Sequence, residues 1–332
     1  MHAPSAVTTP KRASSAKRLY AAVDVGGTKI AGGLVDEDGA LLFQVARATP
    51  AGGTAADVLA AAHEVVDRLA GDPRWGQVAA LGIGSAGPVD TARGTVSPVN
   101  IPSWRGFPLV RSVADHAAVG ALPVVLGGDA VAMTAAEHWR GAARGHANAL
   151  CMVVSTGVGA GLVLNGALHA GPTGNAGHLG HISVDLDGEP CPCGSRGCVE
   201  VLASGTAIAR HALRNGWQPP GEDRSAGAVA ASARDGDPVA LAAFDRAAQA
   251  LAAGIAATAT LVEIDLAVVG GGVAQAGDTL FGPLRRHLSR YATLSFVSGL
   301  EVVPAALGTD AGLVGAAALA VARYGPEAKV RS

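Results

Sequence analysis

The stretch LYAAVDVGGTKIAGGLVD, residues Leu19–Asp36, decides the fold of this chain. An apolar run ends at Val25, a glycine turn follows, and a second apolar run begins after Lys29. The polar turn DEDG then leads into a third run, LLFQVAR. Apolar runs separated by short turn signals predict neighbouring strands of one sheet. We therefore expect an antiparallel meander of three strands, with the glycine turn at its first corner.

The same pattern returns in the middle of the chain, in ALCMVVSTGVGAGLVLNGAL, residues Ala149–Leu168. A strand, a glycine turn and a strand again follow one another, and NG is a typical hairpin turn. Two such units predict a duplicated α/β architecture, in which each lobe offers its glycine turn to a shared cleft. Ligands of α/β proteins bind where strands end and such loops gather.

We expect the chain as a whole to have four parts. A disordered tail at 1–18 is followed by a first α/β lobe at 19–128 and a second α/β lobe at 129–309. A closing helix at 310–325 is expected to pack back on the first lobe. The tail carries four basic residues and no apolar segment, so it is not a secretory signal. A helix is expected to open near Asp129, directly after the strand LPVVL.

Composition narrows the function classes. The 332 residues are 49% hydrophobic and 16% charged, with a formal net charge of -2, so no basic field attracts nucleic acid or a membrane surface. No apolar run approaches the roughly 20 residues that span a bilayer. Four cysteines in a chain of this length do not suggest a disulfide scaffold, and they fit a reducing cytoplasm, where clustered cysteines are metal ligands first.

The first glycine turn, DVGGTK, has the parts of a phosphate site. It is neither GxxxxGK[ST] nor GxGxxG, because a strand and not a helix follows. Its glycines expose backbone N–H groups, its threonine adds a hydroxyl, its lysine adds a positive charge, and its aspartate could hold Mg²⁺ through water. The candidate residues are Asp24, Gly26, Gly27, Thr28 and Lys29.

The second turn, STGVGAG, supplies similar parts through Thr156, Gly157 and Gly159. A third run, GGG at Gly270–Gly272, offers a flat backbone for an adenosine, with Gly271 and Gly272 as the candidates. Each run alone is equally compatible with a tight hairpin. The three together, each after an apolar strand, favour nucleotide binding, with ATP as the expected ligand.

The segment GHLGHISVDLDGEPCPCGSRGCVE, residues 177–200, is predicted to hold a metal. Three thiolates and one imidazole form a closed tetrahedral Zn²⁺ site with no position left for water, so the zinc would be structural. The predicted ligands are His181, Cys191, Cys193 and Cys198. Buried free thiols are the alternative, and a redox pair is less favoured because C-x-C lacks the usual spacing. Cys151 lies in a strand and is expected in the core.

A base for phosphoryl transfer is expected at Asp129, since this chemistry needs positioned phosphates, a metal and a carboxylate aimed at the attacking hydroxyl. The alternative is that this carboxylate is only a helix N-cap. Other polar groups could line a sugar pocket: Asn100, His178, His181 and Glu200.

The motifs DVGGTKIAGGLVD, GSAGPVD, GDAVAMTAAEHWRG, STGVGAGLVLNGALHAG, GHLGHISVD, CPCGSRGCVEVLASG and TDAGLVGAA resemble the ROK family, which holds sugar kinases and sugar-responsive repressors. The resemblance implies the actin-like (hexokinase/Hsp70) ATPase fold. It implies that Asp129 removes a proton from the 6-hydroxyl of a sugar. It also implies sugar contacts by Gly87, Asn100, Glu200 and His181, a cleft that closes, and a homo-oligomer.

Two positions depart from the family pattern. Gly128 stands where Asn usually precedes the catalytic Asp, and His178 stands where glucose kinases usually have Glu. This His variant, with STGVG before it and CVEVLASG after it, is similar to bacterial N-acetylmannosamine kinases. An imidazole can accept or donate one hydrogen bond and leaves room for a bulkier group at C2 of the sugar. A glucokinase, a kinase of a sugar-like cyclitol and a sugar-binding protein without catalysis remain alternatives. A repressor is disfavoured, because about twenty residues before DVGGTK are too few for a helix-turn-helix.

Overall fold

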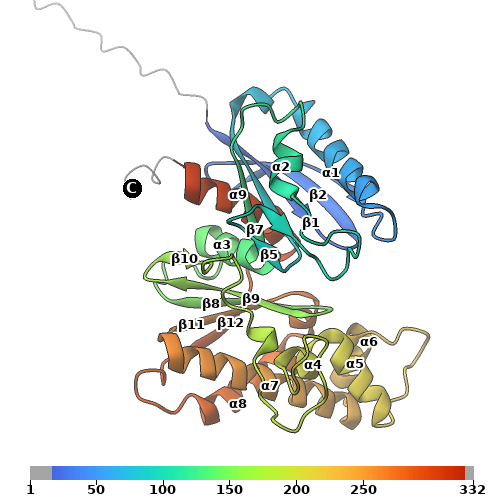
Figure 1. Cartoon of the computed structure of the whole chain (residues 1–332). Coiled ribbons are helices and arrows are strands. Elements are labelled where there is room, and N and C mark those ends of the chain that lie inside the picture. Colours follow the sequence, from blue (N-terminus) through green and yellow to red (C-terminus); the bar gives the residue numbers. More distant parts are fainter. Residues whose placement is uncertain (1–16, 326–332) are drawn as a thin grey trace, which may run out of the picture.

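The computed structural model describes residues 17–325, which form two lobes, each built on a five-stranded sheet (Figure 1). The first sheet has the order β3-β2-β1-β4-β7, with β1 (Leu19–Val25), β2 (Lys29–Asp36), β3 (Leu41–Ala48), β4 (Val78–Ser85) and β7 (Val124–Gly128). The second has the order β10-β9-β8-β11-β12, with β8 (Ala149–Val154), β9 (Val158–Leu164), β10 (Ala167–His169), β11 (Leu266–Gly270) and β12 (Glu301–Pro304).

The two sheets share one connectivity. In each, three consecutive strands pair antiparallel, and two later strands add in parallel beside the first of them. The predicted meander and the predicted duplication are therefore confirmed. Each glycine turn joins the first two strands of its sheet, so the two turns occupy equivalent places in the two lobes.

Helices cover both faces of the first sheet. On one face lie α1 (Ala55–Ala70) and α2 (Leu109–Ala114), and on the other lies the closing helix α9 (Ala311–Tyr324). Helix α1 begins at Thr54, which forms a capping box with Asp57. Helix α9 runs directly against β4, since a Cβ at Gly82 would collide with the carbonyl of Ala316.

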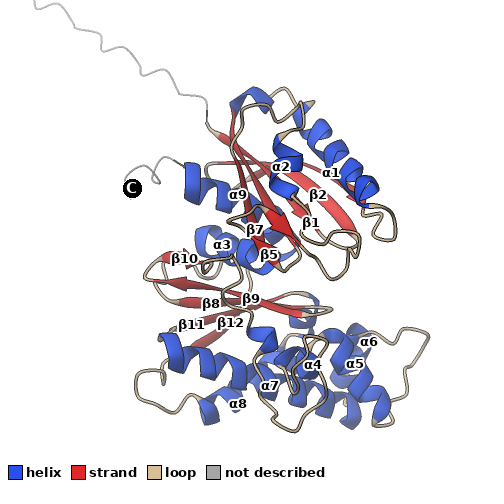
Figure 2. Cartoon of the chain, viewed as in Figure 1, coloured by secondary structure: helices blue, strands red, loops and turns tan. Residues whose placement is uncertain are grey.

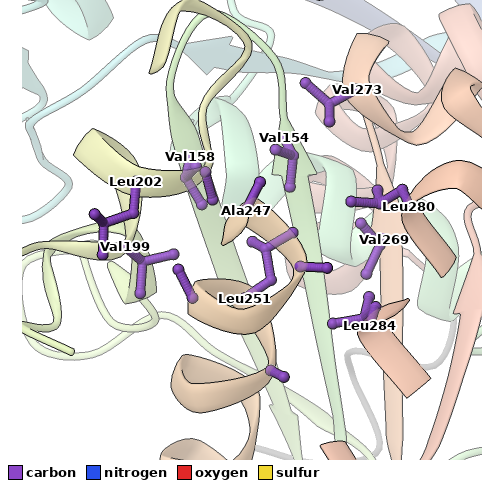
Figure 3. Packing of buried hydrophobic residues seen from close by; sticks show 14 of the residues in the cluster. Val154, Val158, Val199, Leu202, Ala247, Leu251, Val269, Val273, Leu280 and Leu284 are labelled. Atoms are coloured by element: carbon purple, nitrogen blue, oxygen red, sulfur yellow. The ribbon is translucent and has the colours of Figure 1, made fainter. Parts of the chain in front are cut away.

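The second sheet lies between α3 (Asp129–Arg140) and a group of five helices. These are α4 (Val199–Ala203), α5 (Gly205–Arg214), α6 (Ala226–Arg234), α7 (Pro238–Val262) and α8 (Asp278–Tyr291). Figure 3 shows Leu251 of α7 among the valines of the sheet. Within residues 17–325, only α7 is long and apolar enough to cross a membrane, but most of its apolar window is buried in this core.

Short elements complete the fold. They are β5 (Val89–Asp90), β6 (Thr95–Val96) and the 3-10 turns η1 (Trp75–Gln77), η2 (Leu179–His181), η3 (Gly272–Ala276) and η4 (Gly308–Asp310). Residues 1–16 of the predicted tail lie outside the described residues. Lys17, the first described residue, pairs with the carboxylate of Asp38.

Helices α3 and α9 pack against each other between the two sheets (Figure 2). The chain enters the second lobe through α3 and returns to the first through residues 305–310, between β12 and α9. These two segments are the covalent connections between the lobes.

Candidate active site

Asp129 is the first residue of α3, and its side chain is exposed. The helix N-cap is Gly128, which has no side chain, so the alternative interpretation of Asp129 as the N-cap is wrong. One carboxylate oxygen of Asp129 accepts a hydrogen bond from the N–H of Ala130 at 2.7 Å. The other oxygen has no bond to the protein among the described residues, so it remains available to a ligand.

Asp24 lies across from Asp129, at the end of β1. Its carboxylate sits against the start of α9, where a Cβ at Gly312 would lie 2.5 Å from Asp24 Oδ2. A cavity of about 350 Å³ opens beside it, lined by Asp24, Lys29, Thr309 and Asp310, among others. A larger hollow of about 390 Å³, between α8 and β12, contains none of the predicted site residues.

The pKa values of both carboxylates are raised. Burial, then the negative charge of Asp129, raises the pKa of Asp24 to about 6, and Lys29 opposes this change. Burial also raises the pKa of Asp129, while the N–H of Ala130 and the ring of His178 oppose it. The side chain of Asp129 touches solvent, so here burial means enclosure by the two lobes and not loss of all water. Both groups therefore hold a proton more readily than exposed carboxylates.

The first glycine turn is held from two sides. The N–H of Gly26 donates to the carbonyl of Lys29 at 3.0 Å, and the hydroxyl of Thr49 donates to the carbonyl of Gly26 at 2.7 Å. Thr28 and Lys29 are exposed. Asn100 lies directly on the turn, since a Cβ at Gly27 would collide with its amide. A predicted sugar contact and a predicted phosphate contact are thus neighbours.

The second glycine turn is held by Glu200. Its Oε2 accepts from the N–H of Val158 at 2.8 Å, and a Cβ at Gly157 would lie 2.6 Å from the same oxygen. Thr156 is exposed at the tip of this turn. Glu200, predicted as a sugar contact, therefore also fixes the backbone of a predicted phosphate turn, which the sequence did not indicate.

Two further glycine positions lie close to these turns. Gly159 faces the first turn of α3, where its Cβ would lie 2.9 Å from Ala130. Gly271 has φ of 88° and lies against the carbonyl of Val154, at the strand end that leads into the second turn. Gly272 begins η3 and is open to solvent.

His178 has one ring nitrogen anchored and one free. Its Nδ1 lies 3.0 Å from the carbonyl oxygen of Asn175, which can only accept, so Nδ1 carries the proton. In the neutral ring Nε2 is then an acceptor. This nitrogen points toward Gly87, whose Cβ would lie 3.9 Å away.

Asn175 links the two lobes, and sequence reasoning missed it. Its side-chain amide binds both backbone groups of Val89, accepting from the N–H at 3.2 Å and donating to the carbonyl at 2.6 Å. Because its own carbonyl holds His178, Asn175 connects the residue that departs from the family pattern to the first lobe. Asn175 and Val89 are 86 positions apart, so no local pattern marks the pair.

The predicted metal ligands come together. One atom each of His181, Cys191, Cys193 and Cys198 lie within 4.8 Å of one another. The sulfurs of Cys193 and Cys198 are 3.8 Å apart, and Cys191 Sγ is 3.8 Å from His181 Nδ1. A tetrahedron with Zn–S bonds of about 2.3 Å has edges of about 3.8 Å, so the cluster fits zinc. Cys151 is fully buried in β8, as expected of a core residue.

The cysteine-rich loop packs against the second glycine turn. A Cβ at Gly180 would collide with the carbonyl of Val158, and Cys198 directly precedes α4, which carries Glu200. On its outer side, the loop is tied to α5 and α7 through Glu189, whose carboxylate lies near three arginines, Arg210, Arg214 and Arg246. The loop therefore joins predicted metal ligands to both predicted substrate sites.

Named kinases match nearly the whole chain. The glucokinase of Thermotoga maritima is 37% identical over 316 residues, which cover 91% of this chain and 97% of that enzyme. The N-acetylmannosamine kinase of Yersinia pestis is 38% identical over 300 residues, which cover 89% and 96%. The crystal structure of a ROK family glucokinase from Streptomyces griseus, in complex with glucose and AMPPNP, has a TM-score of 0.76 at 36% identity, covering 91% and 98%.

The fold, the cleft and these relatives define the class of the protein: it is an ATP-dependent sugar kinase with the actin-like fold, as the sequence predicted. The sequence model of the ROK family matches residues 20–323, so the chain belongs to the ROK family. Glucokinases and N-acetylmannosamine kinases are similar to it at nearly equal identity, and these identities do not separate the two substrates.

Proposed function

We propose that this kinase transfers the γ-phosphate of ATP to the 6-hydroxyl of a hexose or amino sugar, with N-acetylmannosamine as the preferred acceptor. The observation that carries the proposal is Asp129, an exposed carboxylate with a raised pKa at the start of α3, whose charge acts on Asp24 and whose neighbour Ala130 lies against Gly159 of the second glycine turn. A base works best when its pKa is near the working pH. Asp129 is then suited to accept the proton of the attacking hydroxyl.

The two glycine turns are proposed to hold the phosphates of ATP. Backbone N–H groups at Gly26, Gly27, Gly157 and Gly159, the hydroxyls of Thr28 and Thr156, and the ammonium of Lys29 would bind the phosphate oxygens. Gly271 and Gly272 would support the adenosine. Asp24 would hold Mg²⁺ through water, and the ion would neutralise charge on the phosphates. Protonation of Asp24 below its pKa of about 6 would remove that ligand.

The sugar is proposed to lie among Gly87, Asn100, His178, His181 and Glu200. His178 supports N-acetylmannosamine, because Nε2 offers a single acceptor where a glutamate would offer two oxygens. A single acceptor satisfies one sugar hydroxyl and leaves the neighbouring position to a larger substituent. A glucokinase, or a kinase of a sugar-like cyclitol, is the second candidate, supported by the 37% identity to glucokinases.

His181, Cys191, Cys193 and Cys198 are proposed to hold a structural Zn²⁺. All four ligand positions would come from the protein, so the ion would order the loop and leave no place for substrate. Removing it is expected to lower the thermal stability and the sugar affinity together. Calorimetry and sugar titration of protein treated with a chelator test this role, and unchanged values in protein shown to be metal-free would disprove it.

A reducing cytoplasm, which would keep these thiols free to bind metal, is the proposed location. A homo-oligomer is also proposed; exposed apolar side chains beyond α8, such as Leu294 and Phe296, would suit an interface. Light scattering coupled to size-exclusion chromatography measures the oligomeric state directly.

The acceptor is identified by an ADP-release assay with ATP·Mg²⁺ and a panel of sugars. The panel holds N-acetylmannosamine, glucose, mannose, N-acetylglucosamine and several cyclitols. A higher kcat/KM for N-acetylmannosamine than for glucose supports the proposal. A preference for glucose would assign a glucokinase that tolerates His178 and Gly128. Nucleotide binding without turnover on any acceptor would favour a sugar-binding protein that has lost catalysis.

A further inference from the structure

Glu137 is a fully buried carboxylate that the proposed chemistry does not use. It lies in the last turn of α3, with 0% of its surface exposed. Its Oε2 accepts from the N–H of Ala142 at 2.7 Å. Its Oε1 accepts from the N–H of Leu307 at 3.0 Å, and both oxygens accept from the N–H of Ala306, at 3.0 and 3.2 Å.

These donors belong to the two connections between the lobes. Ala142 follows α3, the segment by which the chain enters the second lobe. Ala306 and Leu307 lie between β12 and α9, where the chain returns to the first lobe. Glu137 and Leu307 are 170 positions apart. One side chain therefore ties together the only two places where the backbone passes from lobe to lobe within residues 17–325.

A role in stabilising α3 alone does not explain this residue. The C-terminal end of a helix carries partial negative charge, so a carboxylate there is unfavourable and a cation is preferred. Burial adds a further cost, which three N–H donors offset. The backbone also leaves space for the group, since a Cβ at Gly141 would collide with Glu137 Oε2. Joining the two connections between the lobes is the role that explains this arrangement.

Each connection leads to a cleft carboxylate. Along α3, Asp129 lies eight residues before Glu137, about 12 Å at 1.5 Å per residue. Beyond Leu307, the chain reaches Gly312, which lies against the carboxylate of Asp24. Fixing Leu307 to the end of α3 therefore also fixes the position of Asp24 relative to Asp129.

We propose that Glu137 is a positioning residue of the kinase: it holds the two interlobe connections together, and so keeps Asp129 aligned with the phosphate side of the cleft through opening and closing. It touches no substrate. This inference rests on the proposed function, in which Asp129 is the base.

Glu137→Gln tests the proposal, because glutamine keeps the shape but presents an NH₂ to one of the N–H donors. Leu251→Ala is the matched control: it weakens the core of the second lobe without touching either connection. We expect Glu137→Gln to lower kcat by about 100-fold, as misplacement of a catalytic group by about 1 Å can do, with KM for ATP and sugar changed much less. Leu251→Ala should lower the melting temperature and leave kcat unchanged at 25 °C.

An unchanged kcat in folded Glu137→Gln, or an equal loss in Leu251→Ala, would overturn the proposal. Asp129→Asn, assayed beside them, separates this failure from a failure of the proposed function. If Asp129→Asn is inactive and Glu137→Gln is fully active, only the positioning role is wrong. If Asp129→Asn is active, the assignment of the base is wrong, whatever Glu137→Gln does.

Hydrogen exchange in the wild-type protein gives a test that needs no variant. The amides of Ala142, Ala306 and Leu307 should exchange slowly, and their protection should stay the same after addition of AMPPNP and the best acceptor of the panel. Fast exchange of Ala306 and Leu307, or protection gained only when ligands bind, would show that Glu137 does not hold the connections in the open enzyme.

Discussion

Helix α3 carries two carboxylates, Asp129 at its start and Glu137 eight positions later. Asp129 is exposed and, among residues 17–325, accepts one hydrogen bond, at the helix end where negative charge is favoured. Glu137 is fully buried, accepts from three backbone N–H groups, and lies at the end where negative charge is disfavoured.

The difference shows that one helix can carry a carboxylate suited to proton transfer, Asp129, and a carboxylate suited to a structural role, Glu137. A carboxylate saturated by protein donors cannot take a proton from a substrate, because its lone pairs are occupied. A carboxylate with a free oxygen and a raised pKa can do so. The helix is rigid, so the saturated group fixes the position of the free one.

The largest effect is expected from Asp129→Asn, which keeps the bond to the N–H of Ala130 but removes the proposed base. Turnover should fall by about 10²- to 10⁴-fold, the range of a general base, while the melting temperature stays the same or rises. Single-turnover assays and calorimetry measure both quantities. A variant that keeps wild-type turnover would show that the two carboxylates do not differ in the way proposed.

Glu137→Ala should produce the opposite pattern in stability. It leaves three buried N–H groups without an acceptor, at about 1–3 kcal/mol each before relaxation, so we expect a loss of about 3–5 kcal/mol. Urea unfolding monitored by circular dichroism measures the change. Thr134→Ala, one turn earlier on the same helix and equally buried, is the control, and it should cost less because it removes one hydroxyl donor, bonded to the carbonyl of Ala130 at 2.8 Å and more weakly to that of Cys151 at 3.4 Å, and leaves no buried N–H group without an acceptor. Equal losses of unfolding free energy in the two variants would show that the contacts of Glu137 contribute no more to stability than the hydroxyl of Thr134.

The sequence was sufficient for features encoded locally. Apolar runs and turns indicated both meanders, the spacing of Cys191, Cys193 and Cys198 indicated one cluster, and Asp129 was recognisable at a strand end before a helix. The structure adds contacts between distant segments. Glu200 binds Val158 from 42 positions away, a partner that no spacing rule suggests.

The sequence marks Glu137 as unusual, although it does not indicate its role. It is the one charged side chain in the buried run AVAMTAAE, residues 130–137, and a lone charge on an apolar helix face needs a partner. Two of its three partners could not be named from sequence, because they are backbone groups 169 and 170 positions later. Because the donors are backbone N–H groups, the side chains at these positions do not indicate the contact, and it is recognised only in the folded structure.

A third carboxylate, Asp24, sharpens the comparison, because its folded-state pKa of about 6 lies above the ordinary 3.8. The native state then binds a proton that the unfolded chain releases between pH 4 and 6, so this group makes the protein less stable as the pH rises through that window. Asp24→Asn should raise the stability of the ligand-free enzyme at pH 7 by about 2 kcal/mol, allowing for partial solvent screening. Activity should fall, since the proposed magnesium ligand is lost.

The gain for Asp24→Asn should shrink toward zero near pH 4, where wild-type Asp24 is already protonated. Unfolding measured at several pH values between 4 and 8 checks this. A gain that is constant with pH would mean that the carboxylate is not the cause. Glu137 offers the contrast: glutamine would present an NH₂ to one of its three N–H donors, so Glu137→Gln should lower stability at pH 7.

The smallest effect is expected at His178, whose ring opposes the burial that raises the pKa of Asp129. His178→Glu replaces one acceptor by two oxygens, as the family pattern has in glucose kinases, and adds a negative charge. We expect the ratio of kcat/KM for glucose to that for N-acetylmannosamine to rise by about tenfold, the low end of what one pocket contact supplies. Like charge should also raise the pKa of Asp129, which moves the acidic limb of the pH–rate profile to higher pH.

His178→Gln separates these two causes, because its amide can accept a hydrogen bond without adding charge. If hydrogen bonding decides the preference, both variants shift the sugar ratio, but only His178→Glu shifts the acidic limb. Neither variant should change the melting temperature by more than a degree or two, since His178 is exposed and bonds only to the carbonyl of Asn175. A sugar ratio that stays constant in both would show that His178 does not select the acceptor. Specificity would then have to come from the Asn100 side of the cleft, where the amide lies on the first glycine turn.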